Sequence, residues 1–183
     1  MLHILTGLTE TQERALMDIY RESNESNIAY FYPDCRDLAE GRARMERDFC
    51  FMLREAFFRV PGNRYFVLEE DGIWVSALRI YPVEDFYWLE ALETHPVYRC
   101  RGYGTALLQQ TIVSLEKDGP VCIRDGVRKT NTASLRTHER AGFVIEHEDE
   151  ITYLPWTVDP ATHEVKAVPR RVVPGNYGMK YGG

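Results

Sequence analysis

The feature that most constrains this chain is a glycine-containing loop between an expected strand and an expected helix. The strand is predicted over residues 86–94, the loop reads Arg-Cys-Arg-Gly-Tyr-Gly over 99–104, and the helix follows over 105–117. Glycines let a ligand approach the backbone, and the first N–H groups of a helix have no partner inside it. The helix macrodipole adds partial positive charge there. The segment therefore predicts an anion site suited to a pyrophosphate, with Arg99 and Arg101 adding charge.

Two other phosphate-binding motifs do not match this loop. A Rossmann fingerprint needs a third glycine at position 107, where this chain has Leu107. A Walker A loop needs Gly-Lys followed by Ser or Thr, and the chain has no Gly-Lys pair. Taken alone, the loop is also compatible with a tight turn flanked by surface arginines.

Hydrophobic periodicity predicts a mixed α/β fold. Before the loop we expect a strand at 2–5, helices at 9–21 and 37–58, and an antiparallel meander of strands at 65–69, 73–81 and 86–94. An aromatic loop is expected at 27–34, and Asp71-Gly72 is typical of a hairpin turn. After the loop we expect a strand at 121–123, a helix at 132–140 and a strand at 143–148, joined by parallel crossovers.

The region after residue 148 contains four prolines, and we expect a hairpin-like extension there over about 149–175. The alternation of Tyr177, Met179 and Tyr181 predicts a final strand at 177–181, with 151–154 as the rival segment. A length of 183 residues suits one domain spanning the whole chain. The extension is also a candidate for a homodimer contact.

Charge and composition narrow the class of protein. A net charge of −6 and a pI near 5.4 disfavour nucleic-acid binding and suit a cationic substrate such as an amine. The four cysteines form no Cys-x-x-Cys pair and no histidine stands at metal-ligand spacing, so no metal site is expected. No apolar run approaches the roughly 20 residues that cross a bilayer, and the start of the chain lacks a basic signal region. We therefore expect a cytoplasmic protein that binds no membrane.

A second segment completes a recognisable pair of motifs. Asn131 is followed by a small residue three positions later, by His138 seven positions later, and then by Gly-Phe at 142–143. Together with Arg-x-x-Gly-x-Gly at 99–104 after a His-Pro pair, this resembles the GNAT superfamily of N-acetyltransferases. The resemblance covers residues 62–143 and implies a GNAT-type fold. One departure stands out, because the family usually has tyrosine at the position of His138.

The resemblance implies that acetyl-CoA binds as the acyl donor and that no metal takes part. The pyrophosphate would lie on the backbone N–H groups of the 99–105 segment. The pantetheine arm would pair with the end of the preceding strand, near an expected bulge at residue 92, and would contact the later helix. The residues implied to bind the cofactor are Leu92, Glu93, Thr94, Arg99, Cys100, Arg101, Gly102, Tyr103, Gly104, Thr105, Asn131 and Ser134.

The reaction implied is direct attack of a neutral amine on the thioester. His138 would protonate the leaving thiolate, which requires the imidazolium form, or would relay a proton or hold a water molecule. For the base we prefer Glu90, with Glu93 and Asp125 as alternatives, although Asp-Gly at 125–126 also reads as a turn. Aromatic walls suit an organic cation, so the acceptor site is predicted from Tyr30, Tyr32 and Trp88, with core packing as the alternative role of these residues.

Two functions are therefore carried forward. The first is an N-acetyltransferase acting on a primary amine of a small molecule or peptide. The second is an acyl-CoA-binding sensor or interaction module with little turnover, motivated by histidine in place of the usual tyrosine. The identity of the amine, the length of the acyl group and the oligomeric state stay open at this point.

Overall fold

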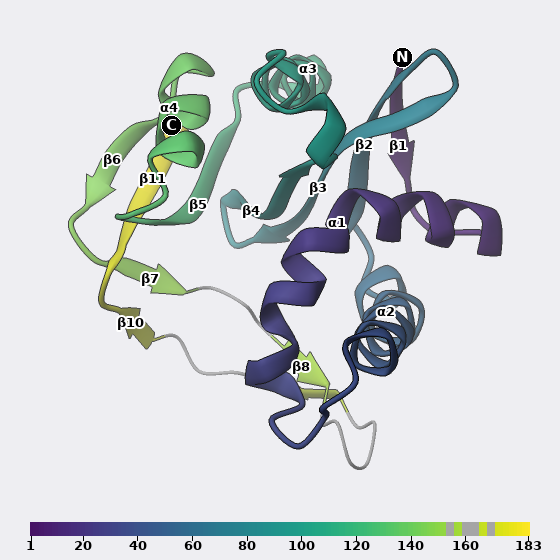
Figure 1. Cartoon of the computed structure of the whole chain (residues 1–183). Helices are drawn as coiled ribbons and strands as arrows, with labels where there is room; N and C mark the ends of the chain where they lie inside the picture. Colours follow the sequence, from purple (N-terminus) through teal and green to yellow (C-terminus); the bar gives the residue numbers. More distant parts are fainter. Residues whose placement is uncertain (153–155, 159–164, 168–170) are drawn as a thin grey trace.

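The computed structural model describes residues 1–152, 156–158, 165–167 and 171–183. Its centre is a seven-stranded sheet with the strand order β1-β2-β3-β4-β5-β11-β6, which confirms the mixed α/β prediction. Helices α1 and α2 cover one face of this sheet, and α3 and α4 cover the other (Figure 1). The strands are β1 (Leu2–Leu5), β2 (Arg64–Glu70), β3 (Ile73–Val83), β4 (Phe86–Thr94), β5 (Cys122–Arg128), β6 (Val144–His147) and β11 (Asn176–Gly182).

Helices α1 (Glu10–Phe31) and α2 (Leu38–Glu55) form an antiparallel pair, and each begins with a side-chain cap. Thr9 forms a capping box with Gln12 at the start of α1, as expected from its residue type. The predicted aromatic loop at 27–34 is wrong, because α1 continues through Phe31. Ile28 packs so closely on α2 that a Cβ at Gly41 would lie 2.7 Å from its Cγ2 atom. This contact buries Ile28 and ties the last turns of the helix to α2.

Strands β2, β3 and β4 form the predicted antiparallel meander. The Asp71-Gly72 turn has positive φ at both residues, which is the geometry that this pair favours. The expected bulge in β4 is present: Glu90 pairs with Arg79, Glu93 pairs with Ala77, and Ala91 has a φ of 55°. The bulge reverses which side chains face each surface of the sheet after this point.

The second half of the sheet departs from the prediction of successive parallel crossovers. Strands β4 and β5 are the one parallel pair of the described sheet. The final strand β11 inserts antiparallel between β5 and β6, so these two strands do not pair with each other. Met179 of β11 is fully buried, and this burial accounts for the insertion. The predicted strand at 177–181 is thus confirmed, and β5 runs through Asp125-Gly126, where a turn was one reading.

The remaining elements connect or extend this core. Helices α3 (Tyr103–Leu115) and α4 (Thr132–Arg140) follow β4 and β5, and three 3-10 turns occur at η1 (Phe57–Arg59), η2 (Pro96–Tyr98) and η3 (Glu116–Asp118). Strand β7 (Glu150–Thr152) pairs with β10 (Arg171–Val173), and β8 (Trp156–Val158) pairs with β9 (Val165–Ala167). The rest of the expected extension, and positions 153–154 of the rival segment, lie outside the described residues. No described helix is long and apolar enough to cross a membrane.

Candidate functional site

The sheet opens between its two central parallel strands. Strands β4 and β5 pair only at Tyr87 with Ile123 and at Trp88 with Arg124. Beyond this point β4 stays paired with β3 and β5 stays paired with β11, so their facing edges have no strand partner among the described residues. Both strands run toward the starts of their following helices (Figure 1). The opening therefore has free backbone edges along its sides and two helix N-termini at its end.

The predicted anion loop lies at this end of the opening. Cys100 and Gly102 have φ values of 61° and 84°, and Gly102 caps α3 without any side-chain hydrogen bond. The first α-helical bond runs from the Ala106 N–H to the Gly102 carbonyl, so the amides at 103–105 have no helical acceptor. A Cβ on Gly102 would meet nothing within 4 Å. This open nest of uncapped amides fits a pyrophosphate.

The two arginines of the loop differ in what they contact. The Arg99 guanidinium donates to the Thr94 carbonyl at 3.1 Å and forms ion pairs with Glu22 and Glu93. Arg99 therefore ties the loop to β4 and α1. Arg101 lies over the Tyr98 ring at 5.3 Å and is exposed.

Close packing between strand and helices sets the position of Gly104. A Cβ there would lie 3.3 Å from Thr137 of α4 and 3.3 Å from the Thr94 hydroxyl. The Thr94 hydroxyl in turn lies 3.1 Å from the Ser76 hydroxyl. Leu92 packs against the apolar cluster beneath α3. The end of β4 is thus held rigidly beside the loop.

Helix α4 begins beside the other edge of the opening. The Asn131 side chain caps it by accepting from the Ser134 amide at 3.1 Å, as its residue type allows. Asn131 is exposed, and Ser134 is partly buried one turn later. Both predicted cofactor residues therefore lie at the start of the helix that follows β5.

Glu90, the predicted base, is engaged by four hydrogen-bond donors. Arg79 donates two bonds to its Oε2 atom at 2.9 and 3.1 Å, and the Tyr81 hydroxyl and Trp88 indole donate to Oε1 at 3.0 and 3.2 Å. A carboxylate has about four lone-pair sites, and all of them are occupied here. Glu90 therefore has no acceptor site left for an incoming ligand.

His138 is buried, with 1% of its surface exposed, and both ring nitrogens are engaged inside the protein. Nδ1 lies 2.8 Å from the Ser134 carbonyl, and Nε2 lies 2.8 Å from the Asp125 carboxylate. A carbonyl can only accept, so Nδ1 carries a proton. Burial opposes charging of the imidazole, but the hydrogen bond and charge of Asp125 outweigh it and raise the pKa of His138. Burial also raises the pKa of Asp125. The two side chains thus share a proton between α4 and β5.

A third carboxylate at the opening, Glu150, was not identified from the sequence. Glu150 of β7 is only 7% exposed, and Asn176 of β11 donates to its Oε2 atom at 2.6 Å. Burial raises the pKa of this carboxyl group. The available signal in the sequence was Gly126, because a glycine inside an otherwise alternating strand marks a close approach by another group.

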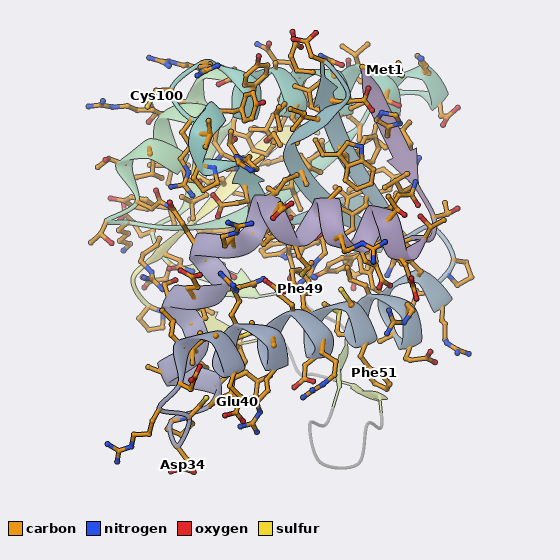
Figure 2. The ribbon with its side chains drawn as sticks, turned by 45° about the vertical axis from the view of Figure 1, so that its right-hand side comes forward. Met1, Asp34, Glu40, Phe49, Phe51 and Cys100 are labelled. Atoms are coloured by element: carbon orange, nitrogen blue, oxygen red, sulfur yellow. The ribbon has the colours of Figure 1, made fainter. Side chains whose placement is uncertain are left out.

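The predicted acceptor residues do not gather at one place. Trp88 is only 3% exposed and lies in the core beside Glu90. Tyr32 bonds to Asp48 of α2, and burial followed by this hydrogen bond raises the pKa of Tyr32 to about 12. Tyr30 is 81% exposed. Asp34, which follows these tyrosines, and Cys100 of the anion loop lie at opposite ends of the molecule (Figure 2).

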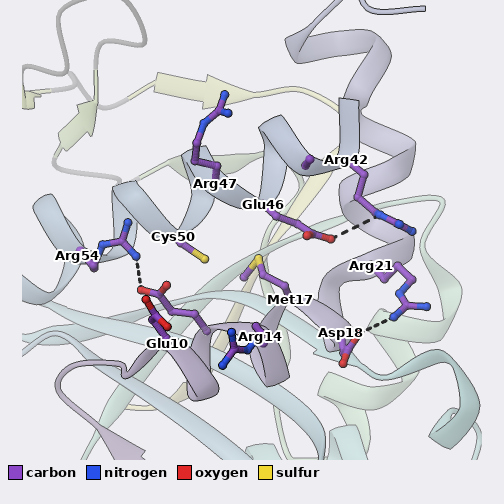
Figure 3. A pocket seen from close by; sticks show the side chains of 12 residues that line it. Glu10, Arg14, Met17, Asp18, Arg21, Arg42, Glu46, Arg47, Cys50 and Arg54 are labelled. Atoms are coloured by element: carbon purple, nitrogen blue, oxygen red, sulfur yellow. Dashed lines mark hydrogen bonds and ion pairs between the residues drawn. The ribbon is translucent and has the colours of Figure 1, made fainter. Parts of the chain in front are cut away.

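A cavity of about 640 Å³ lies between α1 and α2, away from the opening (Figure 3). Arginines and carboxylates alternate along its walls and pair with one another, as Asp18 with Arg21 at 2.5 Å and Glu46 with Arg42 at 3.8 Å. These pairs largely cancel its charge. No group of three or more His, Cys, Asp or Glu residues in the described part of the chain could hold a metal ion.

Comparison with known proteins agrees with this geometry. The model of the acetyltransferase (GNAT) family matches residues 15–143. Comparison with curated proteins gave no significant match. Among solved structures, PaiA N-acetyltransferase from Thermoplasma acidophilum, in complex with coenzyme A, is 15% identical with a TM-score of 0.62, over 100% of this chain and 99% of that one.

Two further structures share the fold. Ribosomal-protein-S18-alanine N-acetyltransferase from Escherichia coli is 21% identical with a TM-score of 0.58, over 100% of this chain and 94% of that one. A chimeric SpeG spermidine N-acetyltransferase from Vibrio cholerae and hSSAT is 11% identical with a TM-score of 0.61, over 98% of this chain and 93% of that one.

Proposed function

Because this chain belongs to the GNAT family of acetyltransferases, we propose that it transfers an acetyl group from acetyl-CoA to a primary amine of a small molecule or peptide. The observation that carries the proposal is the opening between β4 and β5, with uncapped amides at its end and buried carboxylates beside it. Structures of this fold include a ribosomal-protein-alanine N-acetyltransferase and a spermidine N-acetyltransferase, so both a protein and a small polyamine are acceptors within the fold.

The residues along the opening fit acetyl-CoA. The amides at 103–105 would bind the pyrophosphate, and Arg101 would add charge from an exposed position. The unpaired edge of β4 after Trp88 would hydrogen-bond to the pantetheine amides as an added strand does. Asn131 and Ser134 would contact the arm from the other side. Bound acetyl-CoA would supply the thioester that the amine attacks.

The His138 and Asp125 pair has a supporting part in this proposal. Neither nitrogen of His138 is free to reach a thiolate, because one faces a carbonyl and the other faces Asp125. A thiol has an ordinary pKa near 8.5, so the thiolate can leave with little help. We infer that His138 is a positioning residue that holds Asp125 and α4 in place and keeps a proton beside the opening.

The engaged state of His138 also favours the second candidate, an acyl-CoA sensor with little turnover. Incubation with acetyl-CoA and a panel of primary amines separates the two. We expect release of free CoA together with a product heavier by one acetyl group. Binding of acetyl-CoA without either signal for any amine would favour the sensor. Cytoplasmic location and a homodimer contact through the C-terminal extension remain predictions.

A further inference from the structure

Strand β7 brings a carboxylate across β5 to the opening. It lies beside β5 and β11, and it leaves the sheet on the side of α1 and α2 (Figure 1). Along β5, Ile123 and Val127 face the cluster under α3, and Asp125 faces α4, so Gly126 faces the opposite side. The Glu150 carboxylate lies directly over Gly126, in the space that a side chain at this position would fill.

The need for glycine at position 126 comes from the packing of Glu150 and not from the backbone conformation of Gly126. Its φ is not in the left-handed region, so an L-residue could adopt this conformation. An added Cβ would overlap the Glu150 carboxylate and would meet no closer backbone obstacle. Strand β5 thus has no side chain at position 126, where the Glu150 carboxylate of β7 lies.

Glu150 and Glu90 lie on the same face of the sheet but differ in hydrogen bonding. Glu90 accepts four bonds and pairs with Arg79. Among the described residues, Glu150 accepts one bond, from the neutral Asn176 amide, and forms no ion pair. A buried carboxylate without a cation has unused capacity for an incoming ammonium group.

The charged groups around Glu150 also favour a cation. Burial raises the pKa of Glu150 most, and the charges of Asp125 of β5 and Glu90 of β4 raise it further, whereas the hydrogen bond from Asn176 of β11 and the charge of Arg171 of β10 lower it. His138 bonds to Asp125. A proton acceptor works best when its pKa is raised toward the working pH, and burial moves Glu150 in that direction.

We propose that Glu150 binds the ammonium group of the acceptor amine and takes the proton that must leave it before attack. This assignment rests on the proposed acetyltransferase function. It gives the segment after β6 a role in the reaction, because that segment supplies a carboxylate with more free acceptor sites than Glu90 of β4 has. Asn176 and Gly126 are positioning residues that hold this carboxylate over β5.

The proton balance of the step is complete. The ammonium gives one proton to Glu150 and becomes a neutral amine, whose nitrogen bonds to the thioester carbon. The carbon–sulfur bond then breaks, the thiolate takes the second proton from the new amide nitrogen, and Glu150 returns its proton to solvent. The net reaction is ammonium plus acetyl-CoA giving the acetamide, free CoA and one proton.

The test uses three variants of the full chain with an amine that the wild type acetylates. Glu150→Gln keeps the shape of the side chain and removes its basicity. Gly126→Ala keeps the carboxylate but pushes it from its place. Glu148→Gln is the matched control, because Glu148 lies two residues away with an exposed side chain. Each variant is first shown to keep the acetyl-CoA-induced rise in melting temperature.

We expect Glu150→Gln to lower kcat/KM at pH 7 by about 100-fold or more, the range of general base catalysis. Gly126→Ala should lower it in the same direction, and Glu148→Gln should match the wild type. The pH profile is the decisive readout. Only the neutral fraction of the amine can react in Glu150→Gln, so its kcat/KM should rise about tenfold per pH unit toward the amine pKa, near 10.4 for a lysine-like amine. The wild type should be flat over this range.

The outcomes separate the two proposals. Wild-type protein that binds acetyl-CoA and acetylates no amine would overturn the proposed function. Wild-type turnover with an unchanged rate and a flat profile in Glu150→Gln would overturn the assignment of Glu150 alone. Should Glu150→Gln fail to fold, Gly126→Ala decides the question, because wild-type kinetics in that variant would show that the position of the carboxylate does not matter.

Discussion

The two ends of the opening between β4 and β5 are built in different ways. At the loop end, the anion site comes from neighbours in the chain, residues 99–105, and from backbone amides. At the carboxylate end, side chains from four different strands form the site: Glu90, Asp125, Glu150 and Asn176. A site made of backbone needs only the local conformation, whereas a site made of side chains depends on which donors pack around each of them.

The same contrast holds between the two carboxylates on one face. Glu90 is held by a partly buried ion pair and two further donors, and among the described residues Glu150 is held by one amide. A carboxylate whose acceptor sites are full stabilises the fold, and one with free sites is available to a ligand. The following predictions test these separate roles in stability and ligand binding, from the largest expected effect to the smallest.

Replacing Arg79 with methionine should cause the largest loss of stability. It would leave the partly buried Glu90 without its cation, and the loss should approach the cost for a buried pair, about 3–5 kcal/mol. Urea unfolding at pH 7 measures the change. Arg47→Met is the control, because the Arg47 and Asp48 pair is exposed and should contribute about 1 kcal/mol or less. Equal losses in the two variants would contradict the structural role given to Glu90.

A change at the loop end should affect ligand binding and spare the core. Acetyl-CoA at 100 times its Kd should stabilise the wild type by about 2.7 kcal/mol. For a chain of this size that corresponds to a rise in melting temperature of about 5–10 °C. Gly102→Val would strain a residue at positive φ and so distort the loop that presents the amides, and the rise should disappear.

Gly7→Val is the control for this experiment, since Gly7 also has open space around it and its φ is not in the left-handed region. It should keep the full acetyl-CoA effect. A normal thermal shift in Gly102→Val would mean that the pyrophosphate binds elsewhere.

His138 should matter more for turnover than for cofactor binding. His138→Ala should lower kcat by up to about 100-fold, the loss that a small misplacement of site groups can cause, because Asp125 loses the side chain that holds it, while the acetyl-CoA melting shift stays as in the wild type. His138→Tyr should recover part of the rate, because a phenol hydroxyl can also donate a hydrogen bond to Asp125. His147→Ala, at an exposed histidine of β6, is the control. Equal kcat for wild type and His138→Ala from about pH 6 to 9 would remove His138 from the mechanism.

The smallest expected effect is a gain in stability in Glu150→Gln, the same variant that should lose activity. The folded-state pKa of Glu150 is raised, so the folded protein binds more protons than the unfolded chain above the ordinary value of 4.5. Stability therefore falls as pH rises through this window. Glu150→Gln lacks this fall and should be more stable than wild type at pH 8, on the order of 0.5–1 kcal/mol, with a smaller difference at pH 4. The stability difference between Glu150→Gln and wild type should therefore be larger at pH 8 than at pH 4. A larger gain at pH 4 than at pH 8 would argue against a raised pKa of Glu150.

Prediction from sequence succeeded where the signal was local. The Asp71-Gly72 turn and the final strand at 177–181 follow from residue type and alternation over a few positions. The bulge in β4 was expected from the family resemblance that nearby motifs carry. Prediction failed where distant residues meet. Helix α1 continues past residue 27 because Ile28 packs on Gly41, and the parallel order stops at β5 because β11 inserts there.

For the site, the sequence by itself determined the loop at 99–105, the helix start at Asn131 and the family to which both motifs belong. These depend on backbone geometry that neighbouring residues impose. Only the tertiary structure decided which carboxylate is free. Arg79, Tyr81 and Trp88 converge on Glu90, whereas Glu150 lies over β5 at a glycine and, within the described part of the chain, accepts from a single amide. The number of donors around a side chain depends on what packs against it, and in this chain the deciding contacts to Glu150 come from β5 and β11, residues 24 to 26 positions away.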